Sequence, residues 1–316
     1  MIIRSGRRAL PVATAFVAII VGVLAAVHYH RLGLTLSHYD ARGHLVVARR
    51  IVDSITPGWQ QIGAVWLPLP HLLNAIPVQV DAFYRTGGSA VAVSILAFGL
   101  ATGAITWIVL ALTESAAAAI AGTAVFVINP NVLYLQSTPM TEPLLIALTT
   151  LAVALLMAWC DGRAGVGASV GGETRVGVAF ALACLTRYEA WPVAACALGA
   201  AVWARWRRGD GLADATRRVA AVALYPALAI VGFLIFSRVV IGEWFVASGF
   251  FVPGATRDIQ RVRTRGGDLY IVARNNDRPL FFRAGPTRRS LTLLGLDEDH
   301  AIGATGAVLR RAGGVP

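Results

Sequence analysis

Residues 89–112 read SAVAVSILAFGLATGAITWIVLAL and contain no charged side chain. A helix needs about 20 consecutive apolar residues to cross a bilayer, and this stretch supplies them. Comparable runs recur at 9–27, 115–133, 143–160 and 219–241. Only 14% of all residues are charged, whereas soluble domains average about 25%. The sequence therefore predicts an all-α membrane protein, built as a multi-pass bundle of transmembrane helices.

The chain is strongly basic, with 28 Lys and Arg against 17 Asp and Glu and a formal net charge of +11. Its arginines lie between apolar runs or in the C-terminal tail, where they can orient membrane spans and meet anionic lipids. We therefore expect membrane lipids, and no nucleic acid, as partners of these charges.

Region 176–206 decides the number of spans. It is too long for one upright helix, and Arg187 and Pro192 interrupt its middle. A helical hairpin keeps the arginines of 205–218 on the cytoplasmic side together with the basic N-terminus, as the positive-inside rule favours. This topology gives about seven spans in the cell membrane and a cytoplasmic N-terminus.

The same topology gathers the polar loops on the outer face, at 28–88, 129–142 and 187–191. Within the first of these loops, the three prolines of 62–80 favour an interfacial or re-entrant segment over a span. Apolar residues at helical spacing predict an interfacial helix over 40–55. We therefore expect a functional site on the outer face.

The character of the chain changes beyond Pro253. Residues 1–252 form the predicted transmembrane domain, whereas 253–316 is a polar, Arg-rich tail without an apolar run of spanning length. We expect a small outer domain, a disordered end, or a truncated or altered continuation of the membrane domain. The acidic run 297–299 is interpreted as a surface patch rather than a metal site.

Two acidic residues stand at the outer ends of predicted helices. Asp40 opens the interfacial helix, and Glu142 opens the span that begins near residue 143. The helix dipole favours a carboxylate at either place, and Thr138 or Thr141 could cap the second helix. A carboxylate near a wet interface is equally suited to general-base catalysis. Both interpretations stay open for both acids.

The tip of the predicted hairpin contains Arg187, Tyr188 and Glu189. A charge at membrane depth costs about 2.5–3.5 kcal/mol. Arg187 and Glu189 therefore either neutralise each other or retain their charge for a function.

The first outer loop also contains His44, Trp66 and His71. A buried structural imidazole is the simplest explanation for His71, and an interfacial aromatic residue the simplest for Trp66. No spacing of Cys and His that is typical of a metal site is visible. We therefore expect no cofactor, with a divalent cation left open.

Four segments, in their order along the chain, resemble the motifs of the GT-C membrane glycosyltransferases. They are YDARGHLVVARRI, WLPLPH, NPNVLYLQSTPMTEPL and LTRYEAWP. The most similar group is that of the protein O-mannosyltransferases and aminoarabinose transferases, glycosyltransferase family 39-like, and the resemblance covers only the N-terminal half of such enzymes. It implies a GT-C fold and transfer of a sugar from a polyprenyl-phosphate donor to a lipid, glycan or protein acceptor on the outer face.

The resemblance also implies roles for individual residues. Asp40 matches the first acidic position and Glu142 the second, so both are expected to be catalytic. Arg187 is expected to face the donor phosphate, because a planar guanidinium can hold a phosphate without a metal. The remaining expected substrate-binding residues are Tyr188, Glu189, His71, His44 and Trp66.

Two other functions stay open. A small-molecule transporter would also bury charges among its spans, although the internal repeats expected of one are not seen. The apolar pattern ends near residue 252, where the resembling enzymes continue through further spans. A non-enzymatic remnant that binds the lipid carrier or partner subunits is therefore the other alternative.

Overall fold

The computed structural model describes residues 5–54, 57–162, 171–240, 242, 244, 256–274, 277–284, 291–296, 300–303 and 308–310. The chain divides into two compact units, Met1–Phe236 and Ser237–Pro316. The boundary that the sequence predicts at 252/253 and the acidic run 297–299 both lie outside the described residues.

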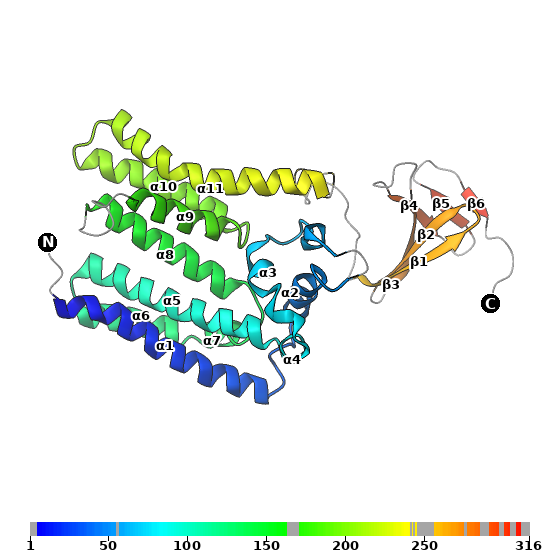
Figure 1. Ribbon diagram of the computed structural model, residues 1–316, viewed down its shortest axis with the longest axis horizontal. Coiled ribbons are helices and arrows are strands. Elements are labelled where there is room, and N and C mark those ends of the chain that lie inside the picture. Colours follow the sequence, from blue (N-terminus) through cyan, green and yellow to red (C-terminus); the bar gives the residue numbers. More distant parts are fainter. Residues whose placement is uncertain are drawn as a thin grey trace. The chain divides into compact units, whose positions relative to one another are not determined.

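Among the described residues, four helices are long and apolar enough to cross a membrane. They are α1 (Ser5–Arg31), α5 (Gly88–Thr113), α8 (Glu142–Cys160) and α11 (Leu212–Val240). Figure 1 shows all four extending in the same general direction through the first unit. The first unit therefore has the helical architecture that the sequence predicts for a membrane protein.

The packing of α1 against α5 depends on small residues. A methyl group added at Gly99 would lie 2.5 Å from Ile19 Cγ1, and one added at Gly103 would lie 3.0 Å from the carbonyl oxygen of Pro11. Glycine at these two positions therefore lets the backbones approach closely, as is common between membrane helices.

A cluster of hydroxyl groups links the same helices in the interior. Thr106 Oγ1 on α5 lies 2.8 Å from Thr14 Oγ1 on α1 and 2.8 Å from Thr123 Oγ1 on α6 (Ala116–Val127). Thr106 is fully buried and also donates to the carbonyl oxygen of Thr102 at 2.8 Å. Three helices are thus joined at one side chain.

We expect Thr106→Val to lower the free energy of unfolding by about 1 kcal/mol, the usual worth of hydrogen bonds between membrane helices. Thermal unfolding in detergent measures the effect. Thr150→Val is the control, because within the described part of the chain the Thr150 hydroxyl bonds only to carbonyls of its own helix. An equal loss in both variants would contradict the interhelical role of Thr106.

The predicted span 115–133 is interrupted near its end. Helix α6 ends at Val127, and a separate helix α7 (Pro130–Leu135) follows. The side chain of Asn129 accepts from the backbone N–H of Asn131 at 2.9 Å, so it caps the new helix, and Pro130 takes the first helical position. The predicted run therefore forms two consecutive helices, and its crossing of the membrane stays a prediction.

The break predicted within 176–206 is confirmed. Helix α9 (Gly172–Cys184) ends before the Arg187 turn, and α10 (Ala190–Arg207) begins directly after it. Together with α6 these helices are shorter or less apolar than the four long ones. The count of seven spans stays a prediction.

The first loop folds into short helices, as its prolines predict. Its elements are α2 (Tyr39–Arg50), η1 (Trp59–Ile62), α3 (Leu69–Asn74), η2 (Pro77–Gln79) and α4 (Asp81–Thr86). Helix α2 is shorter than the predicted 40–55. Arg49 at its end pairs with Asp53 at 2.8 Å and with Asp81 at 2.7 Å, which holds the chain in a bend after the helix.

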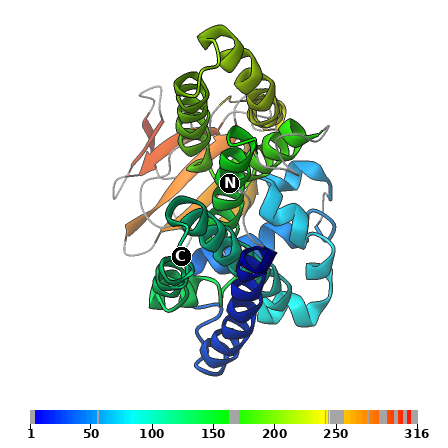
Figure 2. The same ribbon diagram turned by 90° about the vertical axis from the view of Figure 1, so that its left-hand side faces the viewer.

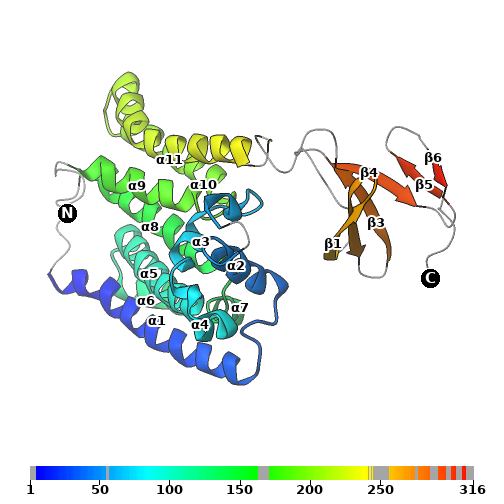
Figure 3. The ribbon, with the colours of Figure 1, turned by 45° about the vertical axis from the view of Figure 1, so that its right-hand side comes forward.

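The short helices gather at one end of the first unit. Figures 1 and 3 show α2, α3 and α4 at the end where α8 begins. The α5–α6 and α10–α11 turns lie at the other end, which faces the viewer in Figure 2. Loops predicted to be outer and inner therefore fall at opposite ends of the helices.

The second unit contains an antiparallel sheet with strands in chain order. The strands are β1 (Thr256–Thr264), β2 (Gly267–Arg274), β3 (Asp277–Ala284), β4 (Leu291–Leu296), β5 (His300–Gly303) and β6 (Val308–Arg310). Tyr270 pairs with Phe282 and Val272 with Leu280, so these four side chains share one face. Val272 and Phe282 are buried. The all-helical prediction thus holds for the first unit and not for the described part of the tail.

Candidate functional site

Three segments that are far apart in sequence meet at the end of the first unit that carries α2 and α3. They are the first loop, the turn before α8 and the turn between α9 and α10, and they enclose a pocket of about 160 Å³. Six predicted site residues line it together with four others: His44, Trp66, His71, Arg187, Tyr188 and Glu189, and Leu67, Pro70, Thr141 and Thr186. We call this space the Arg187 pocket.

Arg187 is the central cation of the site. Its Nη1 donates to Glu142 Oε1 at 2.9 Å and to Thr141 Oγ1 at 3.1 Å. Its Nη2 donates to Glu189 Oε1 at 2.8 Å, and its Nε lies 3.2 Å from both oxygens of Glu189. The pairing of Arg187 with Glu189 that the sequence suggested is present, and Glu142 completes the set from another helix.

Arg187 and Glu189 keep their charges near neutral pH. Hydrogen bonding to Glu189 raises the pKa of Arg187 despite its partial burial, and the charges of Glu142, Glu189 and Asp40 raise it further. The same hydrogen bond lowers the pKa of Glu189. The side chain of Glu189 is 58% exposed and that of Glu142 only 26%. Glu189 is therefore the carboxylate that another anion could displace from Arg187.

Glu142 begins α8, but the predicted hydroxyl cap is wrong. The N-cap residue Thr141 makes no capping hydrogen bond and instead accepts from Arg187, while Thr138 Oγ1 donates to the carbonyl oxygen of Leu135. Glu142 Oε2 is buried and has no protein partner among the described residues. A buried carboxylate oxygen is rarely left unsatisfied. It is therefore available to accept a hydrogen bond from a ligand.

Asp40 lies in the first turn of α2, whose N-cap His38 accepts from the Asp40 backbone N–H at 3.2 Å. Its carboxylate is half-buried and makes no hydrogen bond or ion pair with any residue in the described ranges. Asp40 does not line the Arg187 pocket, although its charge acts on Arg187. Both the helix-dipole role and the catalytic role stay compatible with this position.

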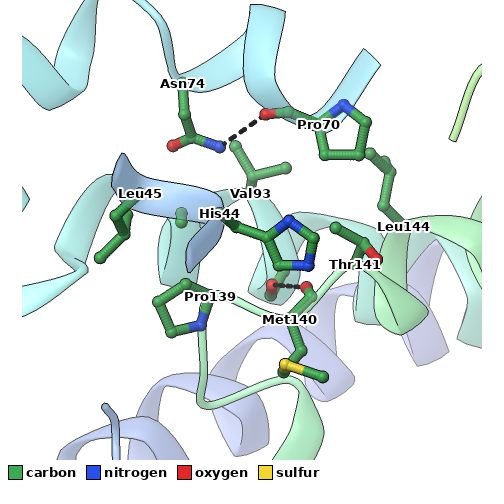
Figure 4. A pocket seen from close by; sticks show the side chains of 11 residues that line it. His44, Leu45, Pro70, Asn74, Val93, Pro139, Met140, Thr141 and Leu144 are labelled. Atoms are coloured by element: carbon green, nitrogen blue, oxygen red, sulfur yellow. Dashed lines mark hydrogen bonds between the residues drawn. The ribbon is translucent and has the colours of Figure 1, made fainter. Parts of the chain in front are cut away.

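His44 and His71 form a buried pair in the wall of the Arg187 pocket. His44 Nδ1 lies 3.0 Å from His71 Nε2, and His71 Nδ1 lies 3.1 Å from the carbonyl oxygen of Leu67. A carbonyl oxygen only accepts, so His71 carries its proton on Nδ1. His44 then donates from Nδ1, which leaves its Nε2 without a proton. Figure 4 shows the His44 ring beside Thr141.

Both imidazoles are neutral at physiological pH. Burial, together with the charges of His71, Arg187 and His38, lowers the pKa of His44 to about 3. Burial also lowers the pKa of His71 to about 4, although its hydrogen bond to Leu67 acts in the opposite direction. The expectation of a buried imidazole at His71 is confirmed.

We expect the stability of the protein in detergent to fall as the pH is lowered below about 6.5, the ordinary pKa of histidine. In the unfolded chain both imidazoles protonate near that pH, whereas in the fold their pKa values are about 3 and about 4. The unfolded state binds more protons throughout this window, so acid favours unfolding. Melting temperatures between pH 8 and pH 4.5 test this. The double variant His44→Gln, His71→Gln should lose part of the slope, and an unchanged slope would contradict the neutral pair.

Two aromatic side chains complete the pocket. The ring centroid of Trp66 lies 4.3 Å from that of His44, and the indole packs against α2, where a Cβ at Gly43 would come within 2.8 Å of it. Tyr188 donates its hydroxyl to the carbonyl oxygen of Ala64 at 2.9 Å, which ties the turn after α9 to the first loop. Trp66 therefore contacts the site directly.

Sequence reasoning missed two threonines that line the pocket. Thr141 and Thr186 each stand directly before a predicted site residue, and this adjacency is the signal that could have identified them. Among the described residues, no group of three His, Cys, Asp or Glu side chains could hold a metal ion.

Comparison of the chain with protein-family models, curated proteins and solved structures gives no match. The function is therefore inferred from the chemistry of the Arg187 pocket and from the motifs of the sequence.

Proposed function

We propose that the protein is an integral membrane glycosyltransferase of the GT-C type, which moves a sugar from a polyprenyl-phosphate donor to an acceptor at the outer face of the membrane. The observation that carries the proposal is Arg187, a cation shared between a partly buried carboxylate and an exposed, displaceable one. The turn between α9 and α10, which contains Arg187, lies at one end of the apolar helices (Figure 1). A donor with a phosphate headgroup and a lipid tail requires both features.

The donor phosphate would bind by exchange with Glu189. Arg187 presents its Nε and Nη2 atoms to Glu189, and these two donors match a bidentate phosphate contact. Glu142 keeps its bond to Nη1 during the exchange, so the guanidinium stays oriented. The phosphate thereby takes the place of Glu189 on Arg187, and the displaced carboxylate, whose side chain is 58% exposed, is hydrated by water.

The transfer step requires a base and a stabilised leaving group. In this proposal Asp40 takes the proton of the acceptor hydroxyl, whose oxygen forms the new bond to the anomeric carbon of the sugar. The bond from that carbon to the phosphate oxygen breaks, and its electron pair leaves with the polyprenyl phosphate. Arg187 stabilises the departing phosphate without a metal, because its charge is permanent.

The sidedness of the loops supports an outer-face site. The Arg187 pocket belongs to the end that carries α2 and α3, whereas the Arg-rich segment around the α10–α11 turn belongs to the opposite end. Arginines retained at one end of the spans favour that end as the cytoplasmic one.

We expect Glu189→Gln to bind farnesyl phosphate about 3–10-fold more tightly than wild type, because the variant removes a competing anion from Arg187. The range corresponds to about 1 kcal/mol, the usual worth of an exposed ion pair. Binding to the purified protein in nanodiscs is measured by titration at low salt.

Asp53→Asn is the matched control, since Asp53 is another exposed carboxylate paired with an arginine but lies outside the pocket. Its affinity should equal that of wild type. Weaker binding in Glu189→Gln would contradict the exchange, and no binding of farnesyl phosphate to any of the three proteins would contradict the proposed function.

A further inference from the structure

The buried histidine pair has no role in the transfer step described above. Its hydrogen bonds run in one direction, from His44 to His71 and from His71 to the carbonyl oxygen of Leu67. This series of hydrogen bonds ends on the carbonyl oxygen of Leu67, which can only accept. The series therefore cannot pass a proton onward. The pair therefore fixes a tautomer instead of relaying protons.

The fixed tautomer gives His44 a defined chemical character. Its Nδ1 is occupied by His71, and its Nε2 keeps an unprotonated lone pair. His44 is only 6% exposed and lines two spaces, the Arg187 pocket and a smaller cavity of about 20 Å³ that it shares with Thr141 (Figure 4). His44 Nε2, held in this way, favours a ligand group that donates a hydrogen bond. It disfavours a group that can only accept one.

We propose that His44 is a specificity-determining residue that accepts a hydrogen bond from a sugar hydroxyl of the donor, and that His71 is the positioning residue that fixes it for this contact. This inference rests on the proposed function. It assigns the sugar, rather than the phosphate, to the side of the pocket formed by α2 and α3.

The neighbouring side chains fit an uncharged sugar. Arg187 takes the anionic part of the donor, whereas His44 is neutral, so the two groups divide a polar ligand into a charged and an uncharged portion. Trp66 also lines the pocket and packs on His44, which offers the apolar face of a sugar ring an aromatic surface. A hydroxyl that donates to His44 Nε2 would satisfy the remaining polar atom of this wall.

Two substitutions at residue 44 separate the contact from the fold. In His44→Asn the amide N–H replaces Nδ1–H and keeps the bond to His71, but the distal acceptor is lost. In His44→Gln the longer amide can place an acceptor near the position of Nε2. The probes are farnesyl phosphate and farnesyl phosphate carrying glucose or mannose, titrated against each protein in nanodiscs.

We expect wild type to prefer one sugar-bearing probe over farnesyl phosphate, and His44→Asn to lose about 5–10-fold of that preference, the worth of one hydrogen bond. Affinity for farnesyl phosphate is measured for each protein as the reference for this preference. His44→Gln should recover part of the preference. A monodeoxy sugar that binds equally to wild type and to His44→Asn would identify the hydroxyl.

His71→Leu tests the positioning role through a signal that simple packing would not change. The ¹⁵N shifts of labelled histidine should report His44 as the Nδ1–H tautomer in wild type and as a mixture in the variant, with the same loss of sugar preference. An unchanged tautomer in the variant overturns the role of His71. Equal affinity of wild type for all three probes, or an unchanged preference in His44→Asn, overturns the role of His44. Failure of farnesyl phosphate to bind wild type would instead contradict the proposed function.

Discussion

Replacing Asp40 by asparagine is expected to lower the turnover of sugar transfer by about 10²–10⁴-fold, the usual contribution of a positioned base. Of the two predicted catalytic acids, Asp40 has a carboxylate without a hydrogen-bonding partner among the described residues, whereas Glu142 already receives a bond from Arg187. Because the carboxylate of Asp40 is not engaged in this way, the proton of the acceptor is expected to go to Asp40. Turnover at saturating donor measures the loss.

Donor binding distinguishes the two acids. Asp40→Asn should bind farnesyl phosphate as wild type does, because its carboxylate makes no bond to Arg187. Glu142→Gln should weaken both binding and turnover, since it removes the charge that orients Arg187. Near-normal turnover in Asp40→Asn would return Asp40 to a role in the helix dipole alone.

Replacing Arg187 by lysine is expected to weaken binding of farnesyl phosphate by about 10–100-fold, because an ammonium cannot reproduce two parallel bonds to a phosphate. Arg187 makes its contacts to Glu142 and Glu189 through three different nitrogen atoms. A lysine at this position can retain one of these contacts at most in the same geometry. Binding by titration measures the change.

The double variant Arg187→Ala, Glu189→Ala separates a structural ion pair from phosphate recognition. Removing one partner leaves a carboxylate without its cation, whereas removing both leaves fewer uncompensated charges. The double variant should therefore unfold at a higher temperature than Arg187→Ala and should bind the phosphate no better. Wild-type affinity in the double variant would remove Arg187 from the site.

The long spans could be predicted from the sequence because their ends are chemically marked. The predicted 89–112 and 143–160 differ from α5 (Gly88–Thr113) and α8 (Glu142–Cys160) by one residue at most at each end. A glycine or a polar residue stands at these ends, such as Gly88, Thr113 and Glu142. The apolar run and the helix therefore end at nearly the same residue. The helix expected over 115–133 ends early, at Val127, because Asn129 and Pro130 interrupt an apolar run without lowering its hydropathy much.

The sequence predicted most of the residues that line the site, but it did not predict which residues of different segments bond to one another. The placement of polar groups on the predicted outer loops, together with the resemblance to the GT-C enzymes, singled out six of the residues that line the Arg187 pocket. The bond between Arg187 and Glu142 joins residues 45 positions apart, and the bond between His44 and His71 joins residues 27 positions apart. Such pairings depend on how α2, α3 and α8 pack, which no local pattern encodes.

The most direct test of sugar transfer at the Arg187 pocket uses the purified full chain in nanodiscs with ¹⁴C-labelled glycosyl farnesyl phosphate. Membranes of a strain that lacks the protein supply the acceptor. We expect label to move from the donor into the acceptor fraction with release of an equal amount of farnesyl phosphate, and both changes to disappear in Asp40→Asn and Arg187→Lys. Label that stays on the donor with the wild-type protein, or transfer at the wild-type rate in either variant, would contradict this function.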